Sequence, residues 1–173
     1  MIDTLQREFL AFSADTLRQQ SGRIASCLEK LTDEQVWARG SDNQNAIGNL
    51  VLHLCGNVRQ WIISGVGGAS DVRQREGEFA ARSGIPVSEL VERLHATVEE
   101  AAAVVERVTT ERLAQSLAIQ GYPVTGLGAI YHVVEHFSGH TGQIIFATKM
   151  LTGVDLGFYR HLTGTAAHSE KAL

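Results

Sequence analysis

The amino-acid sequence predicts an all-α fold, a four-helix bundle with long loops between its helices. Four segments repeat apolar residues at intervals of three and four, the spacing of one helix face. No pair of segments is convincing as paired strands, and there is no internal repeat. The composition, with 44% hydrophobic residues and only 2 prolines, is typical of a globular chain that packs a core.

The length of 173 residues fits one domain that can bury a core without disulfides. We therefore interpret residues 1–173 as a single helical-bundle domain. Its helices are expected at about 2–31, 46–64, 87–108 and 126–151, with a tail at 154–173 whose last ten residues are expected to fray.

Residues 2–31 are predicted to form a long amphipathic helix, because apolar side chains recur along one face. That face is made by Leu5, Phe9, Phe12, Thr16, Ile24, Leu28 and Leu31. Thr32 and Gln35 have the spacing of a capping box, so a short helical turn through Trp37 is expected before Gly40 interrupts the chain.

The second helix is predicted at 46–64, because cap-forming side chains crowd the positions just before it. The segment 65–85 combines five glycines with dense charge and little periodicity. We interpret this segment as a long loop, either solvated or in contact with a partner.

Pro86 and Ser88 are expected to open the third helix, at 87–108. Its apolar stripe consists of Leu90, Leu94, Val98, Ala101, Val105 and Val108. The stretch 113–124 contains turn-forming residues around Pro123 and is predicted to be extended or irregular.

The fourth helix is predicted at 126–151, with Thr125 as its cap and Gly153 as its stop.

Charge and hydropathy exclude several classes of partner. The net charge is -4 and basic residues are scattered, so nucleic acid is not expected as a partner. The chain has no apolar stretch of about 18 residues and no basic start followed by an apolar run, so neither membrane insertion nor secretion is expected. Cys27 and Cys55 lack CxxC spacing and fit a reducing compartment. We therefore expect a soluble cytoplasmic protein.

The fourth helix carries a run of histidines, in the sequence YHVVEHFSGHTGQII. His132, His136 and His140 follow one another at four-residue steps, so neighbours differ by only about 40° around the helix. Two imidazoles one turn apart can bind a single cation at about 2.0–2.1 Å. A lone HxxxH pair also fits surface or hydrogen-bonded histidines, so a second helix must supply further evidence.

The second helix supplies His53, which lies beside a polar strip of Asn49, Asn57, Gln60 and Ser64. This strip is either the solvent face or the lining of an interior cavity shared with the histidine side of the fourth helix. The cavity is favoured, because the helix carries only one charged residue, Arg59, where a wet face normally displays several.

We therefore predict that His53, His136 and His140 bind one divalent metal ion. Three neutral ligands leave a position for water or substrate, as in catalytic sites. His132 is too far along the helix to join them and is assigned to the lining of the site. Four amides are also predicted to line the pocket, namely Asn49, Asn57, Gln60 and Gln143. Of these, Asn57, Gln60 and Gln143 would either orient a substrate or the imidazoles, or pair with backbone as buried amides.

The motifs NAIGNLVLHLCGNVRQWI and HVVEHFSGHTGQII resemble those of the DinB/YfiT-like superfamily, over nearly the whole chain. The resemblance implies a helical bundle, often a homodimer, whose three histidines bind zinc, nickel or a similar ion, with water completing the shell. His53, His136 and His140 correspond to those ligands. Similar proteins include thiol-dependent enzymes, among them mycothiol-dependent maleylpyruvate isomerases and bacillithiol S-transferases.

The expected function is therefore metal-dependent activation of a low-molecular-weight thiol, or of water, for reaction with a small-molecule substrate. Zinc is the first choice of metal, with nickel, iron or manganese as alternatives. A non-catalytic metal- or ligand-binding stress protein is the alternative function, and purely structural histidines are a third. Homodimerisation would fit outward-facing Val51, Val58, Val134 and Ile145, which ordinary core packing would explain equally well.

Overall fold

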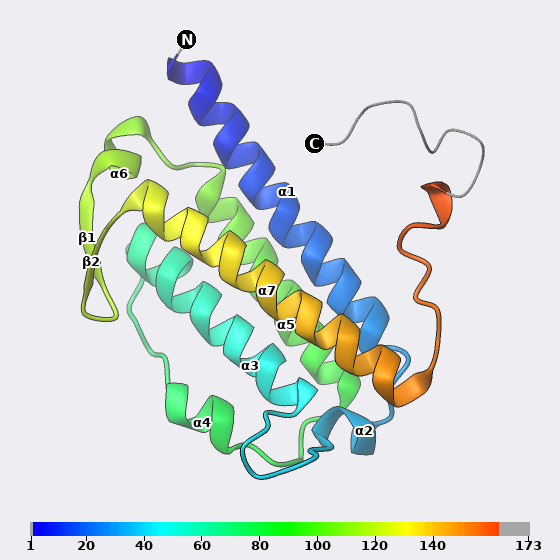
Figure 1. The fold of residues 1–173 in the computed structure, drawn as a ribbon. Helices are drawn as coiled ribbons and strands as arrows, with labels where there is room; N and C mark the ends of the chain where they lie inside the picture. Colours follow the sequence, from blue (N-terminus) through cyan, green and yellow to red (C-terminus); the bar gives the residue numbers. More distant parts are fainter. Residues whose placement is uncertain (1, 163–173) are drawn as a thin grey trace.

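The protein folds as a bundle of four long helices in a computed structural model, which describes residues 2–162 (Figure 1). These helices are α1 (Ile2–Leu28), α3 (Ile47–Val58), α5 (Val87–Val105) and α7 (Gly126–Thr152). The predicted all-α bundle is thus confirmed. Each of α1 and α3 packs against both α5 and α7, so the core lies between the two pairs.

Helix α1 buries the predicted face near its C-terminal end, at Ile24 and Leu28, but turns a different face to the core in its N-terminal half. Leu5 and Phe12 are exposed, whereas the buried face runs through Leu10, Ala14, Leu17, Ile24 and Leu28. The physical reason is that α1 packs on α5 and α7 on one side only, so apolar residues on its other side stay in solvent.

The caps predicted at Thr32, Thr125 and Gly153 are present, whereas α3 starts after Ala46, which makes no side-chain cap. Thr32 and Gln35 form the capping box of the short helix α2 (Asp33–Trp37). The Thr125 hydroxyl accepts a hydrogen bond from the Gly128 amide at the start of α7, and Gly153 ends α7 in the left-handed conformation at φ 67°.

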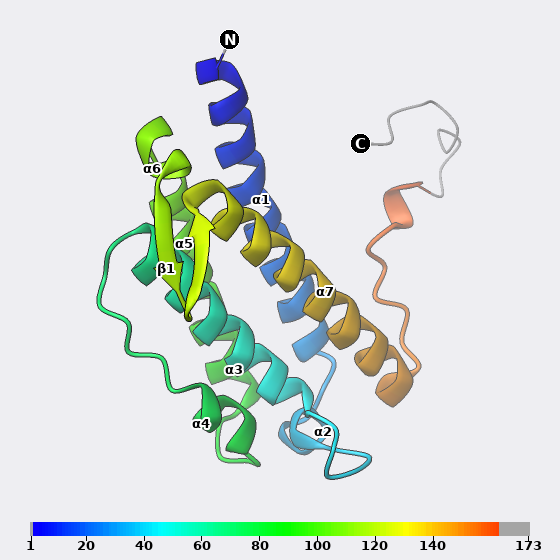
Figure 2. The ribbon, with the colours of Figure 1, turned by 60° about the vertical axis from the view of Figure 1, so that its left-hand side comes forward.

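The segment before α7 corrects the sequence prediction, which recognised no strand pair there. It contains the short helix α6 (Thr110–Ala114) and an antiparallel hairpin of β1 (Ser116–Ile119) and β2 (Tyr122–Thr125) (Figure 2). Gln120 and Gly121, at the turn, both have positive φ, the geometry of a tight hairpin turn. The hairpin contacts the end of the second long helix and the start of α7.

The segment predicted as a plain loop at 65–85 is also more ordered than expected. Helix α3 continues as the π-helical element η1 (Arg59–Val66), and the short helix α4 (Arg75–Ala80) follows. Residues 67–85 pass along the outer side of α3, and Glu78 in α4 is buried there. We call residues 67–85 the strap.

The chain after α7 runs back beside the bundle to the short 3-10 helix η2 (Arg160–Leu162). The predicted fraying of the last ten residues falls outside the described part of the chain. Within the described residues, no helix combines the length and apolarity needed to cross a membrane.

Replacement of Gly126 by alanine is expected to destabilise the fold. A Cβ at this position would lie 2.2 Å from the Arg112 carbonyl oxygen, so the backbone of α6 or α7 must shift. Overpacking of this kind costs about 1–3 kcal/mol in the free energy of unfolding, measured by chemical denaturation. Gly139→Ala in the same helix is the control, because nothing lies within 4 Å of its Cβ. It should stabilise α7 by about 0.5–1 kcal/mol. Equal stabilities of the two variants would contradict the close packing at Gly126.

Candidate metal centre

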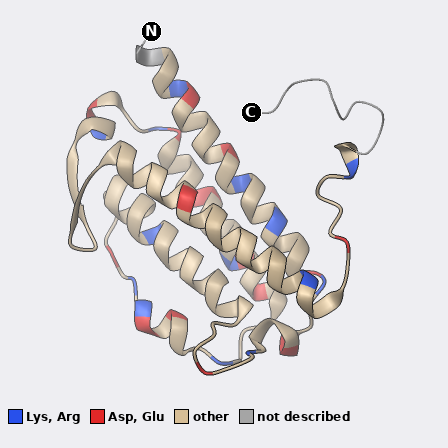
Figure 3. Ribbon diagram, in the orientation of Figure 1, with Lys and Arg blue, Asp and Glu red and all other residues tan. Residues whose placement is uncertain are grey.

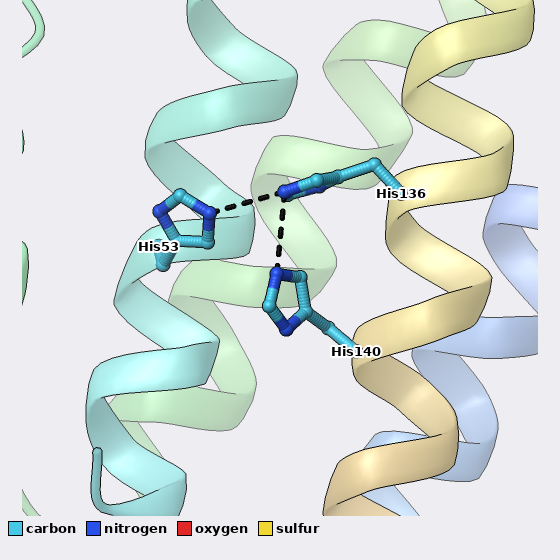
Figure 4. Close-up of side chains that lie close together, drawn as sticks. All are labelled: His53, His136 and His140. Atoms are coloured by element: carbon cyan, nitrogen blue, oxygen red, sulfur yellow. Dashed lines mark hydrogen bonds between the residues drawn. The ribbon is translucent and has the colours of Figure 1, made fainter. Parts of the chain in front are cut away.

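The side chains of His53, His136 and His140 meet between α3 and α7 (Figure 4). The Nε2 atom of His136 lies 3.1 Å from Nε2 of His53 and 3.2 Å from Nε2 of His140. One ring nitrogen from each of the three residues lies within 4.8 Å of the others. His53 is buried, and the two histidines of α7 are half-buried. The structure thus brings the three predicted ligands together from two helices.

The arrangement of these nitrogens fits one divalent ion. Ligand nitrogens at 2.0–2.1 Å from a tetrahedral ion lie roughly 3.3 Å from one another, close to the two distances measured to His136. The three rings are inclined to each other by 63°, 82° and 75°, so their edges converge and their faces do not stack. Three imidazoles without a carboxylate could hold zinc or a similar transition metal.

The remaining nitrogen of His53 contacts a charged pair on the strap. Its Nδ1 atom lies 3.1 Å from Oε2 of Glu78. Arg73 binds the same carboxylate with two bonds, from Nε at 2.7 Å and from Nη2 at 2.8 Å. The Arg73 and Glu78 side chains are only 3% and 9% exposed, so this is a buried, bidentate ion pair. The strap therefore brings a fixed carboxylate to the back of His53.

Two hydrogen bonds, from His53 to Glu78 and from His140 to Gln143, determine which ring nitrogens are free to bind a metal. Nη2 of Arg73 also lies 3.1 Å from Nδ1 of His53. Because the ionised Glu78 carboxylate can only accept hydrogen bonds, we assign a proton to Nδ1 of His53, which donates it to Oε2 of Glu78. Oε1 of Gln143 lies 2.8 Å from Nδ1 of His140 and accepts in the same way. Both contacts leave the Nε2 lone pair directed at the common centre, as metal-binding histidines require.

Burial keeps the two imidazoles of α7 neutral. Loss of solvation, with repulsion from His140 and His53, lowers the pKa of His136 to about 3. Burial also lowers the pKa of His140, although the hydrogen bond with Gln143 opposes it. Burial alone would raise the pKa of Glu78, but the hydrogen bonds from Arg73 and His53 outweigh it, so this pKa is lowered. At neutral pH, α7 therefore offers two neutral ligands, and the strap offers an ionised carboxylate.

The polar strip beside His53 is predicted from the sequence to line a cavity shared with α7. In the structure three of its residues, Asn49, Gln60 and Ser64, are bonded to the strap instead. Asn49 is buried and binds backbone atoms of Ala46, Glu78 and Ala81, so it joins α3 to the strap. Gln60 accepts a hydrogen bond from Arg73 and donates one to Asp71. Asn49 thus pairs with backbone, whereas Gln60 pairs with two charged side chains of the strap and not with backbone, the alternative considered for it.

Asn57 and His132 also lie near the predicted site, without a direct contact with the three nitrogens. Asn57 is buried, and its Oδ1 atom has no hydrogen-bond partner in the described part of the chain. The His132 ring lies 4.2 Å from the Trp61 ring and 5.6 Å from that of His136, between centroids. His132 is thus a packing neighbour of the site. Among the other histidines, His95 and His161 are exposed, and His168 lies outside the described residues.

Glu78 and Arg73 were not recognised in the sequence. The expectation that a metal-binding histidine has a carboxylate behind it is general, but the strap holds several acidic residues with no helical period to choose among them. One signal was available, because Gly56 lies one turn after His53. A Cβ at Gly56 would lie 1.9 Å from Oε1 of Glu78, so only glycine lets the carboxylate approach.

The residues proposed for a dimer surface are part of the core. Val51 and Val58 are fully buried, and Val134 and Ile145 pack against the core while partly buried. Ordinary core packing, the alternative interpretation, is therefore correct for these four residues. They carry no argument for homodimerisation.

Comparisons with known proteins agree with this fold. The family described as "Protein of unknown function (DUF1572)" matches residues 4–163. Among solved structures, a conserved protein from Enterococcus faecalis is similar at TM-score 0.71 and 14% identity, covering 83% of this chain and 97% of that one. A DinB-like protein from Bacillus cereus is similar at TM-score 0.62 and 14% identity, covering 79% and 88%. Comparison with curated proteins gave no match. At such identities the structural likeness establishes the DinB-like fold alone.

Proposed function

Since this chain belongs to the DUF1572 family, a family of DinB-like proteins, we propose that it is a metal-dependent enzyme. We propose one divalent ion, zinc before nickel, iron or manganese, held by His53, His136 and His140. The reaction proposed is transfer or isomerisation of a small electrophilic substrate with a low-molecular-weight thiol as cosubstrate, or hydrolysis with water in its place.

One observation carries this proposal, namely three imidazoles that converge from two helices without a carboxylate among them. Structural zinc sites are closed by four protein ligands, whereas sites with three protein ligands keep a position for a reacting molecule. A divalent ion in such a position stabilises a thiolate over a thiol, or lowers the pKa of water toward 7. Both reactions need the same open site.

The protein's own residues orient the ligands and shield the site. Glu78 accepts a hydrogen bond from Nδ1 of His53, and Gln143 accepts one from Nδ1 of His140. These bonds direct the Nε2 atoms of both histidines to the centre. Arg73 keeps Glu78 ionised and in place. The Phe79 ring, 4.9 Å from the His53 ring between centroids, covers that imidazole from the strap side.

Turnover of an electrophile is expected only when a thiol and the metal are both present. A panel of bacterial thiols with a generic electrophile, monitored by loss of free thiol, tests this expectation. Chelation of the metal should reduce the rate to the uncatalysed one, and restoring the metal should recover it. Thiol consumption that does not change on metal removal would exclude the thiol reaction.

A non-catalytic metal- or ligand-binding role in stress is the alternative. Tight metal binding without turnover on broad panels would favour it. The cytoplasm is proposed as the compartment, since both cysteines are free thiols. Homodimerisation is proposed from the family resemblance alone.

A further inference from the structure

A cavity of about 720 Å³ lies between α3, α7 and the connection from α2 to α3. Its walls include the apolar side chains Ile47, Leu50, Phe146, Ala147 and Met150. Phe146 and Met150 are 67% and 71% exposed, so the cavity opens to solvent along α7. Figure 3 shows that charged residues are sparse on both helices that form these walls. A small molecule with an apolar body would bury those walls on binding.

This cavity adjoins the three-histidine site. Leu50 precedes His53 by three residues on α3, and Gln143 follows His140 by three residues on α7. Gln143 belongs to both places, because it lines the cavity while its Oε1 atom holds Nδ1 of His140. A molecule in the cavity therefore lies next to the ligands of the proposed metal ion.

Arg39 supplies the cavity with a positive charge that no acidic residue among the described ones neutralises. Its Nη2 atom donates only to neutral acceptors, the Asn49 amide oxygen and the carbonyl oxygens of Phe79 and Ala81. Within residues 2–162, Arg39 forms no ion pair, and neither its Nε nor its Nη1 has an acceptor. The Glu78 carboxylate, on the nearby α4, is already bound by Arg73.

A guanidinium held in this way is suited to bind an anion. Its Nη2 bonds fix the plane of the group, so little rotamer freedom remains to be lost on binding. Nε is buried, whereas Nη1 is left for a carboxylate or sulfonate oxygen. Partial burial of Arg39 and the apolar walls strengthen such a charge-assisted hydrogen bond relative to one in water.

We propose that the substrate of this site is an organic anion with an apolar body, whose carboxylate or sulfonate binds Arg39 while the body lies on Leu50, Phe146 and Met150. This assignment of a substrate class rests on the proposed function, which it extends. The anion-binding role of Arg39 acts through direct contact with the ligand and does not require the metal.

The test uses 4-phenylbutanoate and its amide, 4-phenylbutanamide, which share one shape and differ in charge. The chain has 2 methionines, so the labelled methyl signal of Met150 reports directly on the cavity. Titration of the metal-loaded protein is expected to shift this signal, with an affinity for the acid about tenfold higher than for the amide. Arg39→Gln should lower the affinity for the acid to that for the amide and leave that for the amide unchanged.

A matched pair of variants separates the cavity from general charge effects. Phe146→Glu places a carboxylate in the cavity wall and should weaken binding of the acid by at least about tenfold. Phe12→Glu on α1 makes the same change at similar exposure, 72% against 67%, and should leave binding unchanged.

Equal affinities for acid and amide, or an unmoved Met150 signal, would overturn the proposal. A second result would also overturn it. If Arg39→Gln lost both the bound metal and the preference for the acid over the amide, while Phe146→Glu kept that preference, the role of Arg39 would be only to hold α4 in place. Titration of His136→Ala separates the two proposals. If His136→Ala still binds the acid more tightly than the amide, the anion site is supported whether or not this variant retains the metal.

Discussion

Replacement of His136 by alanine is expected to remove the bound metal, from about one ion per chain to below about a tenth. His136 is the central ligand, since its Nε2 atom lies within 3.2 Å of Nε2 of both other histidines. Loss of one of three ligands leaves two imidazoles, fewer than the three that catalytic zinc sites retain. His53→Ala and His140→Ala are expected to act in the same direction. Elemental analysis of protein purified without a histidine tag measures the effect.

Circular dichroism of the same samples tests whether the fold survives. Helicity should remain nearly unchanged, because the core is formed by apolar residues of all four long helices. His132→Ala is the matched control, since this histidine lies on the same helix and contacts Trp61. It should retain metal. Wild-type protein without metal under metal-replete conditions, or metal retained in all three ligand variants, would refute the proposed centre.

Replacement of Glu78 by alanine is expected to have the second largest effect. It leaves the Arg73 guanidinium, 3% exposed, without its counter-charge, and His53 without the acceptor of its Nδ1 proton. Breaking a buried ion pair from one side costs about 3–5 kcal/mol, a cost limited here by release of the strap into solvent. Loss of a carboxylate behind a metal-binding histidine lowers metal affinity by about 10–100-fold. Competition with a chelator measures that affinity, and trypsin cleavage at the strap arginines measures its release.

Two further variants identify the cause. Glu76→Ala removes an exposed carboxylate from the same α4 and should change neither metal affinity nor cleavage. Gly56→Ala keeps every charge but places a Cβ 1.9 Å from Oε1 of Glu78, so it should displace the carboxylate and lower metal affinity. Metal affinity at the wild-type level in both Glu78→Ala and Gly56→Ala would show that the strap has no part in the site.

The wrong and incomplete predictions share a physical origin. The hairpin was not recognised because its strands have only four residues each and its turn residues, Gln120 and Gly121, are a weak signal. The sequence predicts a loop where the strap forms α4, because α4 has six residues, too few to show a helical period. Short elements depend on contacts with the rest of the fold more than on their own pattern.

The sequence by itself determined the four long helices, the caps of α7 and the histidines that α3 and α7 can offer, because those features depend on residues a few positions apart. Only the tertiary structure decided what surrounds the histidines. The Arg73–Glu78 pair and the unpaired guanidinium of Arg39 reach the site from connections without periodicity, and their places depend on how those connections fold back over α3. The local periodicity of the sequence predicts where the helices lie, whereas contacts between distant segments depend on how the whole chain packs.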